Sequence, residues 1–178
     1  MVSEIKIRNI INHYKSYRES DPDTWIEFSA TQSNLKDAIK VSSLCINQCN
    51  KRHPHQYRIK SKSLKELCDK LLKQITIIEE SKTFDELFSI IDRTAVYGIG
   101  DLTKYDVAQR IGKYLKLFPT KIYVHSGTKI GAQYLIGKIK GRTITKEQLP
   151  KIFNDDNLSC SEIEDILCIY KERFKSRI

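Results

Sequence analysis

Residues 84–117 read FDELFSIIDRTAV-YGIG-DLTKYDVAQRIGKYLKL, and this stretch decides the fold that we expect. In its first and last parts, apolar residues recur at the three- and four-residue spacing of an amphipathic helix. Between those parts, Gly98 and Gly100 form a short turn. Thr83 and Glu86 have the spacing of a capping box, which marks the start of the first helix. The sequence therefore predicts a helix, a glycine turn and a second helix over residues 84–117.

The glycine turn is a candidate anion-binding site. Paired glycines allow positive φ and bring the main chain close to a ligand, and the amides that open the next helix attract an anion. The chain has 31 Lys and Arg against 22 Asp and Glu, a formal charge of +9, so we expect nucleic-acid phosphate. The alternative is a helical hairpin whose glycines serve only to turn the chain. The residues expected to contact DNA here are Tyr97, Gly98, Ile99, Gly100, Thr103 and Lys104.

Composition restricts the class of protein. A chain of 178 residues, of which 40% are hydrophobic, is long enough for one domain with a buried core. It has no run of about 20 apolar residues, so we expect no membrane span. The N-terminal residues lack the apolar run of a secretory signal, and the five cysteines are odd in number. These features predict a cytoplasmic, nucleoid-associated monomer with reduced thiols.

Helical periodicity continues through most of the chain, and the predicted fold class is all-α with about eight or nine helices. Ser33 is a candidate cap for a helix that runs through Cys49. Ser63 and Glu66 have capping-box spacing, which predicts a helix over residues 64–80.

The C-terminal part has the same character. Ser159 and Glu162 have capping-box spacing before another helix. Only residues 121–125 look extended, and they have no obvious partner strand. We expect a compact single domain over residues 1–178, and we also consider two helical lobes, 1–81 and 82–178, around a cleft.

The segment around the glycine turn resembles the helix-hairpin-helix DNA glycosylase superfamily. The resemblance covers about residues 84–130 and rests on Val96-Tyr-Gly-Ile-Gly100, the helix before it, and Pro119 followed by residues 121–125. It implies an all-α protein that binds duplex DNA through hairpin amides. It also implies that a flipped nucleotide enters a pocket between two lobes, where its N-glycosidic bond is hydrolysed.

The sequence departs from that family at its catalytic positions. The family usually carries an aspartate in the extended segment after the second helix, where this chain has Ile122-Tyr-Val-His125. Lyase-type members carry a lysine two residues after the last hairpin glycine, where this chain has Leu102. Glycosidic cleavage requires a carboxylate near the developing positive charge, and Asp106 is the candidate. Helix-start stabilisation is the alternative role for Asp106.

Two further residues are candidates for catalysis. Lys104 could contact phosphate or attack a sugar carbon, although an exposed helical lysine is the commoner case. His125 could face a substrate across a cleft, or it could be a hydrogen-bonded histidine of the core. The candidate catalytic residues are therefore Asp106, Lys104 and His125.

Residues 51–58, KRHPHQYR, are a candidate recognition loop. They combine cations, imidazoles, an amide and an aromatic ring, a composition that suits phosphate, base edges or a stacked base. A solvated basic loop is the alternative. The expected base-binding pocket consists of His53, His55, Gln56, Tyr57, Arg58 and His125.

Two weaker patterns are also present in the sequence. The ligands of a zinc site could come from Cys45, Cys49, His53 and His55, but their spacing matches no usual zinc motif, and small core cysteines explain it more simply. We therefore expect no metal and no cofactor. Lys129, in a Gly-Thr-Lys segment before another helix, is a further candidate DNA contact.

The function expected from these features is that of a DNA glycosylase acting on a damaged or modified base in double-stranded DNA. A non-catalytic helix-hairpin-helix DNA-binding protein is the first alternative. A helical subunit whose positive face binds an acidic protein is the second.

Overall fold

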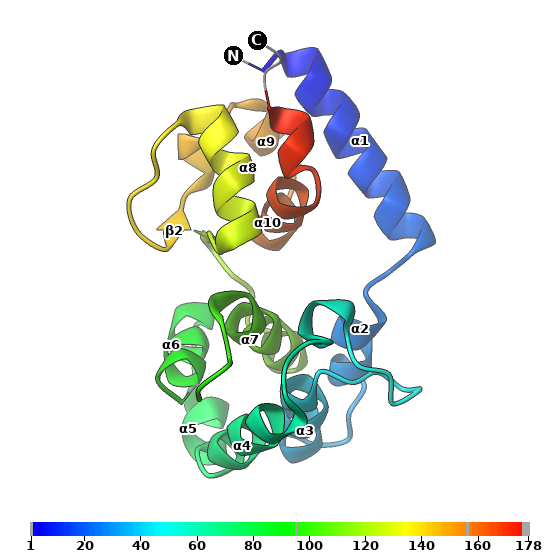
Figure 1. The fold of residues 1–178 in the computed structure, drawn as a ribbon, viewed down its shortest axis with the longest axis vertical. Helices are drawn as coiled ribbons and strands as arrows, with labels where there is room; N and C mark the ends of the chain where they lie inside the picture. The colour runs from blue at the N-terminus through cyan, green and yellow to red at the C-terminus, as the bar shows by residue number, and fades with distance from the viewer. Residues whose placement is uncertain (1, 95, 156, 176–178) are drawn as a thin grey trace. The chain divides into compact units, whose positions relative to one another are not determined.

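The computed structural model describes residues 2–94, 96–155 and 157–175. They contain ten α-helices and one two-stranded antiparallel sheet, which confirms the all-α class (Figure 1). The chain divides into two units. Unit 1 combines Met1–Pro22 with Pro119–Ile178, and unit 2 is the intervening segment Asp23–Phe118. In the described residues no helix is long and apolar enough to span a membrane.

Unit 2 is built around a central helix, α7. The unit contains α2 (Thr24–Ala30), α3 (Leu35–Leu44), η1 (Pro54–Gln56), α4 (Ser61–Leu72), α5 (Ile75–Glu80), α6 (Phe84–Thr94) and α7 (Asp101–Leu115). Helix α7 packs against α2, α3 and α6, and it buries Val107, Ala108 and Ile111. Their spacing places these side chains on one apolar face of the helix, and that face forms part of the core.

Unit 1 joins the two ends of the chain. It contains α1 (Glu4–Ser20), β1 (Ile122–Tyr123), α8 (Ser126–Ile136), β2 (Thr143–Ile144), η2 (Lys146–Gln148), α9 (Ile152–Asp155), α10 (Cys160–Ile169) and η3 (Lys171–Phe174). Tyr14 and Arg18 of α1 both donate hydrogen bonds to the Asp165 carboxylate, at 2.9 and 2.5 Å. This contact and a shared apolar core hold the N-terminal helix to the C-terminal segment.

The division into units differs from the lobes 1–81 and 82–178 that we considered from the sequence. Helix α1 packs against α9 and α10, whereas α4 packs against α6. The first contact joins the two ends of the chain, and the second crosses the expected boundary near residue 81. Local periodicity reveals neither of these two helix contacts, because each joins segments that are separated in the sequence.

Three local expectations need correction. The third helix ends at Leu44, because Cys45 adopts a left-handed conformation with φ of 56°, and Asn34 rather than Ser33 caps its start. The expected helix over residues 64–80 begins earlier, at Ser61, and breaks into α4 and α5 around Gln74. The extended segment does have a partner, since Ile122 and Tyr123 pair with residues 143–144.

Two capping boxes are confirmed. Thr83 accepts a hydrogen bond from the Glu86 amide, and the Glu86 carboxylate accepts one from the Thr83 amide, at the start of α6. Ser159 and Glu162 make the same reciprocal pair at the start of α10. Capping boxes can be predicted from sequence spacing because a cap depends only on residues within one helical turn.

Helices α8 and α10 are neighbours in unit 1 (Figure 1). Gly131 lies at their contact, and a Cβ atom built on it would collide with the carbonyl oxygen of Leu167. Because that obstacle is main chain, it cannot rotate away. The contact therefore requires a residue without a side chain.

We expect Gly131→Ala to destabilise the protein by about 1–3 kcal/mol, because the added methyl group forces α8 and α10 apart. Urea unfolding followed by far-UV circular dichroism measures this loss. The control is Gln133→Ala, an exposed position on the same helix, which should stay within about 0.5 kcal/mol of the parent. Equal stability of the two variants would contradict the close approach.

Candidate functional site

The turn between α6 and α7 presents its tip to solvent. Gly98 has φ of +88°, a conformation that side-chain-bearing residues rarely adopt. Tyr97 is 98% exposed, whereas Ile99 is only 6% exposed. The amide of Ile99 donates a hydrogen bond to the carbonyl oxygen of Val96 at 3.1 Å. The turn is thus anchored by one apolar side chain and leaves an aromatic ring at its tip.

Helix α7 begins directly after this turn. Gly100 is its N-cap residue, and a Cβ atom at that position would meet nothing within 4 Å. Gly100 has no side chain that could cap the helix. Thr103 as a whole is only 4% exposed, so its hydroxyl is not available at the surface for a phosphate contact. A helix N-terminus that is open beside Gly100 suits an anion.

Lys104 is held by two carboxylates. Its Nζ atom lies 2.9 Å from Asp92 and 3.2 Å from Asp101. Burial alone would lower the pKa of the ammonium group, but the hydrogen bonds to the two aspartates outweigh it and raise the pKa. Lys104 is therefore charged and locally neutralised. It is poorly suited to attack a sugar carbon, since that reaction requires the free amine.

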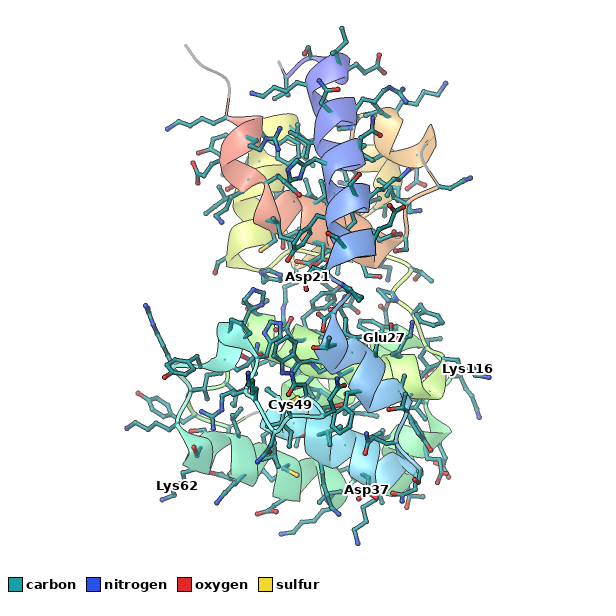
Figure 2. All side chains as sticks on the ribbon, turned by 90° about the vertical axis from the view of Figure 1, so that its right-hand side faces the viewer. Asp21, Glu27, Asp37, Cys49, Lys62 and Lys116 are labelled. Carbon is teal, nitrogen blue, oxygen red and sulfur yellow. The ribbon has the colours of Figure 1, made fainter. Side chains whose placement is uncertain are left out.

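A cationic segment borders the glycine turn. A Cβ atom on Gly98 would lie 3.4 Å from the Ser63 hydroxyl, so the turn lies against the first turn of α4. Residues 51–65, which lead into α4, contain no acidic residue. Their exposed cations are Lys51, Arg58, Lys60, Lys62 and Lys65, of which Lys62 is labelled in Figure 2. Tyr57, in the same segment, is 77% exposed.

Hydrogen bonds hold this segment in place. The Arg52 guanidinium donates to the carbonyl oxygen of Ile59 and to the Ser61 hydroxyl, both at 2.9 Å. The Trp25 indole donates to the carbonyl oxygen of Lys51 at 2.9 Å. Because the cations are attached to an ordered backbone, less entropy is lost when they bind a ligand. We call residues 51–65 together with 97–100 the cationic face.

His53, His55 and Gln56 of this segment join Asp106 and Arg110 of α7 in a polar cluster. Gln56, fully buried, donates a hydrogen bond from Nε2 to Asp106 Oδ2 at 2.5 Å. His55 Nδ1 lies 3.5 Å from the same carboxylate oxygen. Arg110 Nη2 lies 3.9 Å from that oxygen and donates to Gln56 Oε1 at 3.3 Å. The His53 ring packs edge-on against the rings of Trp25 and His55.

The cluster holds an ionised carboxylate beside a neutral imidazole. Burial would raise the pKa of Asp106, but hydrogen bonds from His55 and Gln56 and the charge of Arg110 lower it below its ordinary value. Burial and the nearby Arg110 charge lower the pKa of His53 to about 4. At neutral pH the site therefore contains a negative charge and an unprotonated base.

The structure joins some of the predicted residues and separates others. His53, His55 and Gln56 of the expected pocket meet the expected catalytic carboxylate, Asp106. Tyr57 and Arg58 are exposed on the cationic face. His125 and Lys129 belong to unit 1. There His125 contacts Thr128 and Glu164, and Lys129 is partly exposed in the first turn of α8.

The site residues predicted from the sequence did not include Arg110, Glu164 or Cys168. Arg110 is 2% exposed, and its Nε and Nη1 atoms have no hydrogen-bond partner among the residues that the structure describes. Its spacing of four residues from Asp106 on a helix was an available signal for an ion pair. Glu164 and Cys168 gave no such signal, because their partner His125 lies in a distant part of the sequence.

Two groups of described residues could hold a metal ion. The ligand atoms lie within 4.8 Å of one another in each group, which are His53, His55 and Asp106 in unit 2 and His125, Glu164 and Cys168 in unit 1. In the first group, the Arg110 guanidinium already offsets the carboxylate charge and opposes a cation. The zinc alternative from the sequence included Cys45 and Cys49. Cys45 is buried and Cys49 exposed, and neither belongs to these groups.

Comparisons with protein-family models, with curated proteins and with solved structures found no match to this chain. The function of this chain is therefore inferred from the geometry of its described residues.

The low pKa of His53 predicts acid sensitivity. Between about pH 6.5 and pH 4, an unfolded histidine binds a proton that folded His53 does not, so stability falls as the pH is lowered through this window. The loss is at most about 3 kcal/mol, and solvent screening at the partly exposed ring reduces it. His53→Asn keeps a hydrogen-bond acceptor but cannot titrate, so its stability should depend less on pH.

Urea unfolding at several pH values in this window tests the prediction. Gln133→Ala, which changes an exposed residue of unit 1 that does not titrate, is the control and should keep the slope of the parent. If His53→Asn and the parent lose stability equally on acidification, His53 is not the group responsible.

Proposed function

We propose that this protein is a DNA glycosylase-like enzyme. It binds duplex DNA through the cationic face and hydrolyses the N-glycosidic bond of a flipped nucleotide at Asp106. One observation carries the proposal. A glycine turn next to a cationic segment opens α7, and the same helix carries an ionised carboxylate in its second turn. The axial rise between residues 101 and 106 is about 8 Å, so a phosphate at the helix start and a nucleotide at Asp106 are close neighbours.

Binding uses main-chain and side-chain groups of the cationic face. The amides after Gly100 hold a backbone phosphate, and Lys60 and Lys62 add charge that depends on salt. Tyr57 and Tyr97 are exposed aromatic rings that can stack on bases. Phosphate contacts of this kind position the protein without reading sequence. The proposed partner is therefore duplex DNA in general, and selectivity belongs to the flipped base.

The buried cluster supplies the chemistry. As the bond between the sugar and the base breaks, positive charge develops on the sugar, and the Asp106 carboxylate stabilises it. A water molecule forms the new bond to the anomeric carbon and transfers a proton to the neutral imidazole of His53. The base leaves with the bonding electron pair and takes up, directly or through solvent, the proton that the imidazole received, so the imidazole returns to its neutral form. The products are the free base and an abasic site. This scheme assigns no step to Lys104, which its aspartate partners neutralise, or to His125, which belongs to unit 1.

One observation favours the non-catalytic alternative. Asp106 Oδ2 already accepts a hydrogen bond from Gln56 and lies near Arg110, an arrangement that also serves to anchor the recognition loop on α7. In that case the protein binds DNA and leaves it unchanged.

The glycine turn can be tested by binding. We expect Gly98→Ala to weaken binding to a fluorescently labelled duplex by about tenfold, because a Cβ atom at positive φ distorts the turn that presents the amides. The matched control is Gly137→Ala. Gly137 also has positive φ, +76°, but lies in unit 1, so its substitution should leave DNA binding unchanged. Anisotropy titrations at one fixed salt concentration measure both variants.

Equal affinity of the two glycine variants would remove the turn from the interface. Absence of any DNA binding by the parent at moderate salt would favour the remaining alternative, a helical subunit that binds an acidic protein.

Catalysis can be separated from binding at Asp106. We expect Asp106→Asn to retain duplex binding and to lose base excision by at least about a hundredfold, because the amide cannot stabilise positive charge. The assay incubates protein with duplexes that carry deaminated, alkylated or oxidised bases and reveals abasic sites by alkaline cleavage. Asp69→Asn, an exposed carboxylate on α4, is the control and should behave as the parent. Tight binding by the parent without strand cleavage on any duplex would support the non-catalytic alternative.

A further inference from the structure

A second polar cluster lies in unit 1, between α8 and α10. His125 is the N-cap residue of α8, and Glu164 and Cys168 are one turn apart on α10, so both face the same side of that helix. One nitrogen, one oxygen and one sulfur from these residues lie within 4.8 Å of one another. The proposed DNA-binding function uses none of the three.

The cluster is buried and its geometry is constrained. Glu164 is 3% exposed and His125 is 7% exposed, and His125 Nε2 contacts Glu164 Oε1 directly. The Thr128 hydroxyl donates to the same carboxylate oxygen at 2.5 Å. Such a second hydrogen bond orients a carboxylate, as the outer partners of metal ligands do. The ammonium group of Lys171 is the nearby cation, and it donates to the main-chain carbonyl of Cys168 at 3.3 Å.

Cys168 lies against a glycine. A Cβ atom on Gly127 would approach Cys168 Sγ to 2.6 Å, so the thiol occupies space that any other residue at position 127 would fill. Cys168 is only partly buried, which gives the cluster a route to solvent.

We propose that His125, Glu164 and Cys168 bind a zinc ion. Imidazole, carboxylate and thiolate are the ligand types of zinc, and the thiolate disfavours magnesium and calcium. Ligand atoms on a tetrahedral zinc ion lie about 3–4 Å apart, so small side-chain rotations bring these atoms into place. Two anionic ligands balance the charge of the ion, and the ion in turn compensates the negative charge of the buried Glu164 carboxylate. Three protein ligands leave the fourth position for water.

The test uses the full chain, first treated with a chelator and kept reduced, and titrated with Co²⁺ as a spectroscopic probe. We expect one cobalt ion per chain, with tetrahedral d–d bands and a sulfur-to-metal charge-transfer band that Zn²⁺ abolishes by displacement. Cys168→Ser should lose the charge-transfer band, and Glu164→Gln should weaken binding by at least about tenfold. Cys49→Ser, which changes an exposed thiol of unit 2, is the control and should bind cobalt as the parent does.

A second measurement keeps the test decisive if one variant does not fold. Zinc that binds only the folded state raises the melting temperature of the parent, and the same addition should leave Glu164→Gln almost unchanged. Failure of the parent to bind cobalt or zinc would overturn the proposal. So would a charge-transfer band that persists in Cys168→Ser, or metal binding that His55→Ala abolishes, since the latter places the ion in unit 2. No step of this test involves DNA, so its outcome is independent of the proposed glycosylase function.

Discussion

The Asp106 carboxylate is the constraint around which unit 2 is organised. A buried carboxylate must be paired or hydrogen-bonded, because an uncompensated charge in the interior costs several kcal/mol. Gln56, His55 and Arg110 meet that need, and two of these three residues come from the loop before α4. Satisfying one charge on α7 therefore fastens a distant loop to that helix.

The attachment of this loop to α7 also determines where the exposed cations of unit 2 lie. The loop that supplies Gln56 continues as the cationic segment that ends in the first turn of α4. That turn lies against Gly98, so the glycine turn and the exposed cations share one side of unit 2. A buried polar contact thus determines where the positive charge lies. The same arrangement brings the ionised Asp106 carboxylate and the neutral imidazole of His53 together on the helix that the glycine turn opens.

In unit 1, two neighbouring carboxylates of α10 are also paired with polar side chains. Asp165 on α10 is paired with Tyr14 and Arg18 of α1, and its neighbour Glu164 turns to His125 and Thr128. Adjacent residues on a helix point in different directions, so the two carboxylates join α10 to two different partners. The first pair closes the unit by joining the two ends of the chain. The second gathers the ligand types of a metal site around Cys168.

The sequence by itself determined the all-α class, the helix starts at Thr83 and Ser159, and a glycine turn between two helices. Each of these depends on residues within a few positions of one another, so spacing alone reveals it. The same reasoning extended one helix beyond its end at Leu44 and joined α4 and α5 into a single helix. The end of α3 and the break before α5 depend on contacts with other parts of the chain, such as the hydrogen bond from Gln74 to Thr94.

Only the tertiary structure decided which polar residues meet. Gln56 and Asp106 are 50 residues apart, and Thr128 and Glu164 are 36 apart. The sequence named His53, His55, Gln56 and Asp106 as candidates, but it could not show that they form one cluster or that His125 has Glu164 and Cys168 as neighbours. Side-chain type indicates what chemistry a residue can perform. Which residues perform it together depends on how helices pack, and that is determined by the whole apolar core rather than by any local pattern.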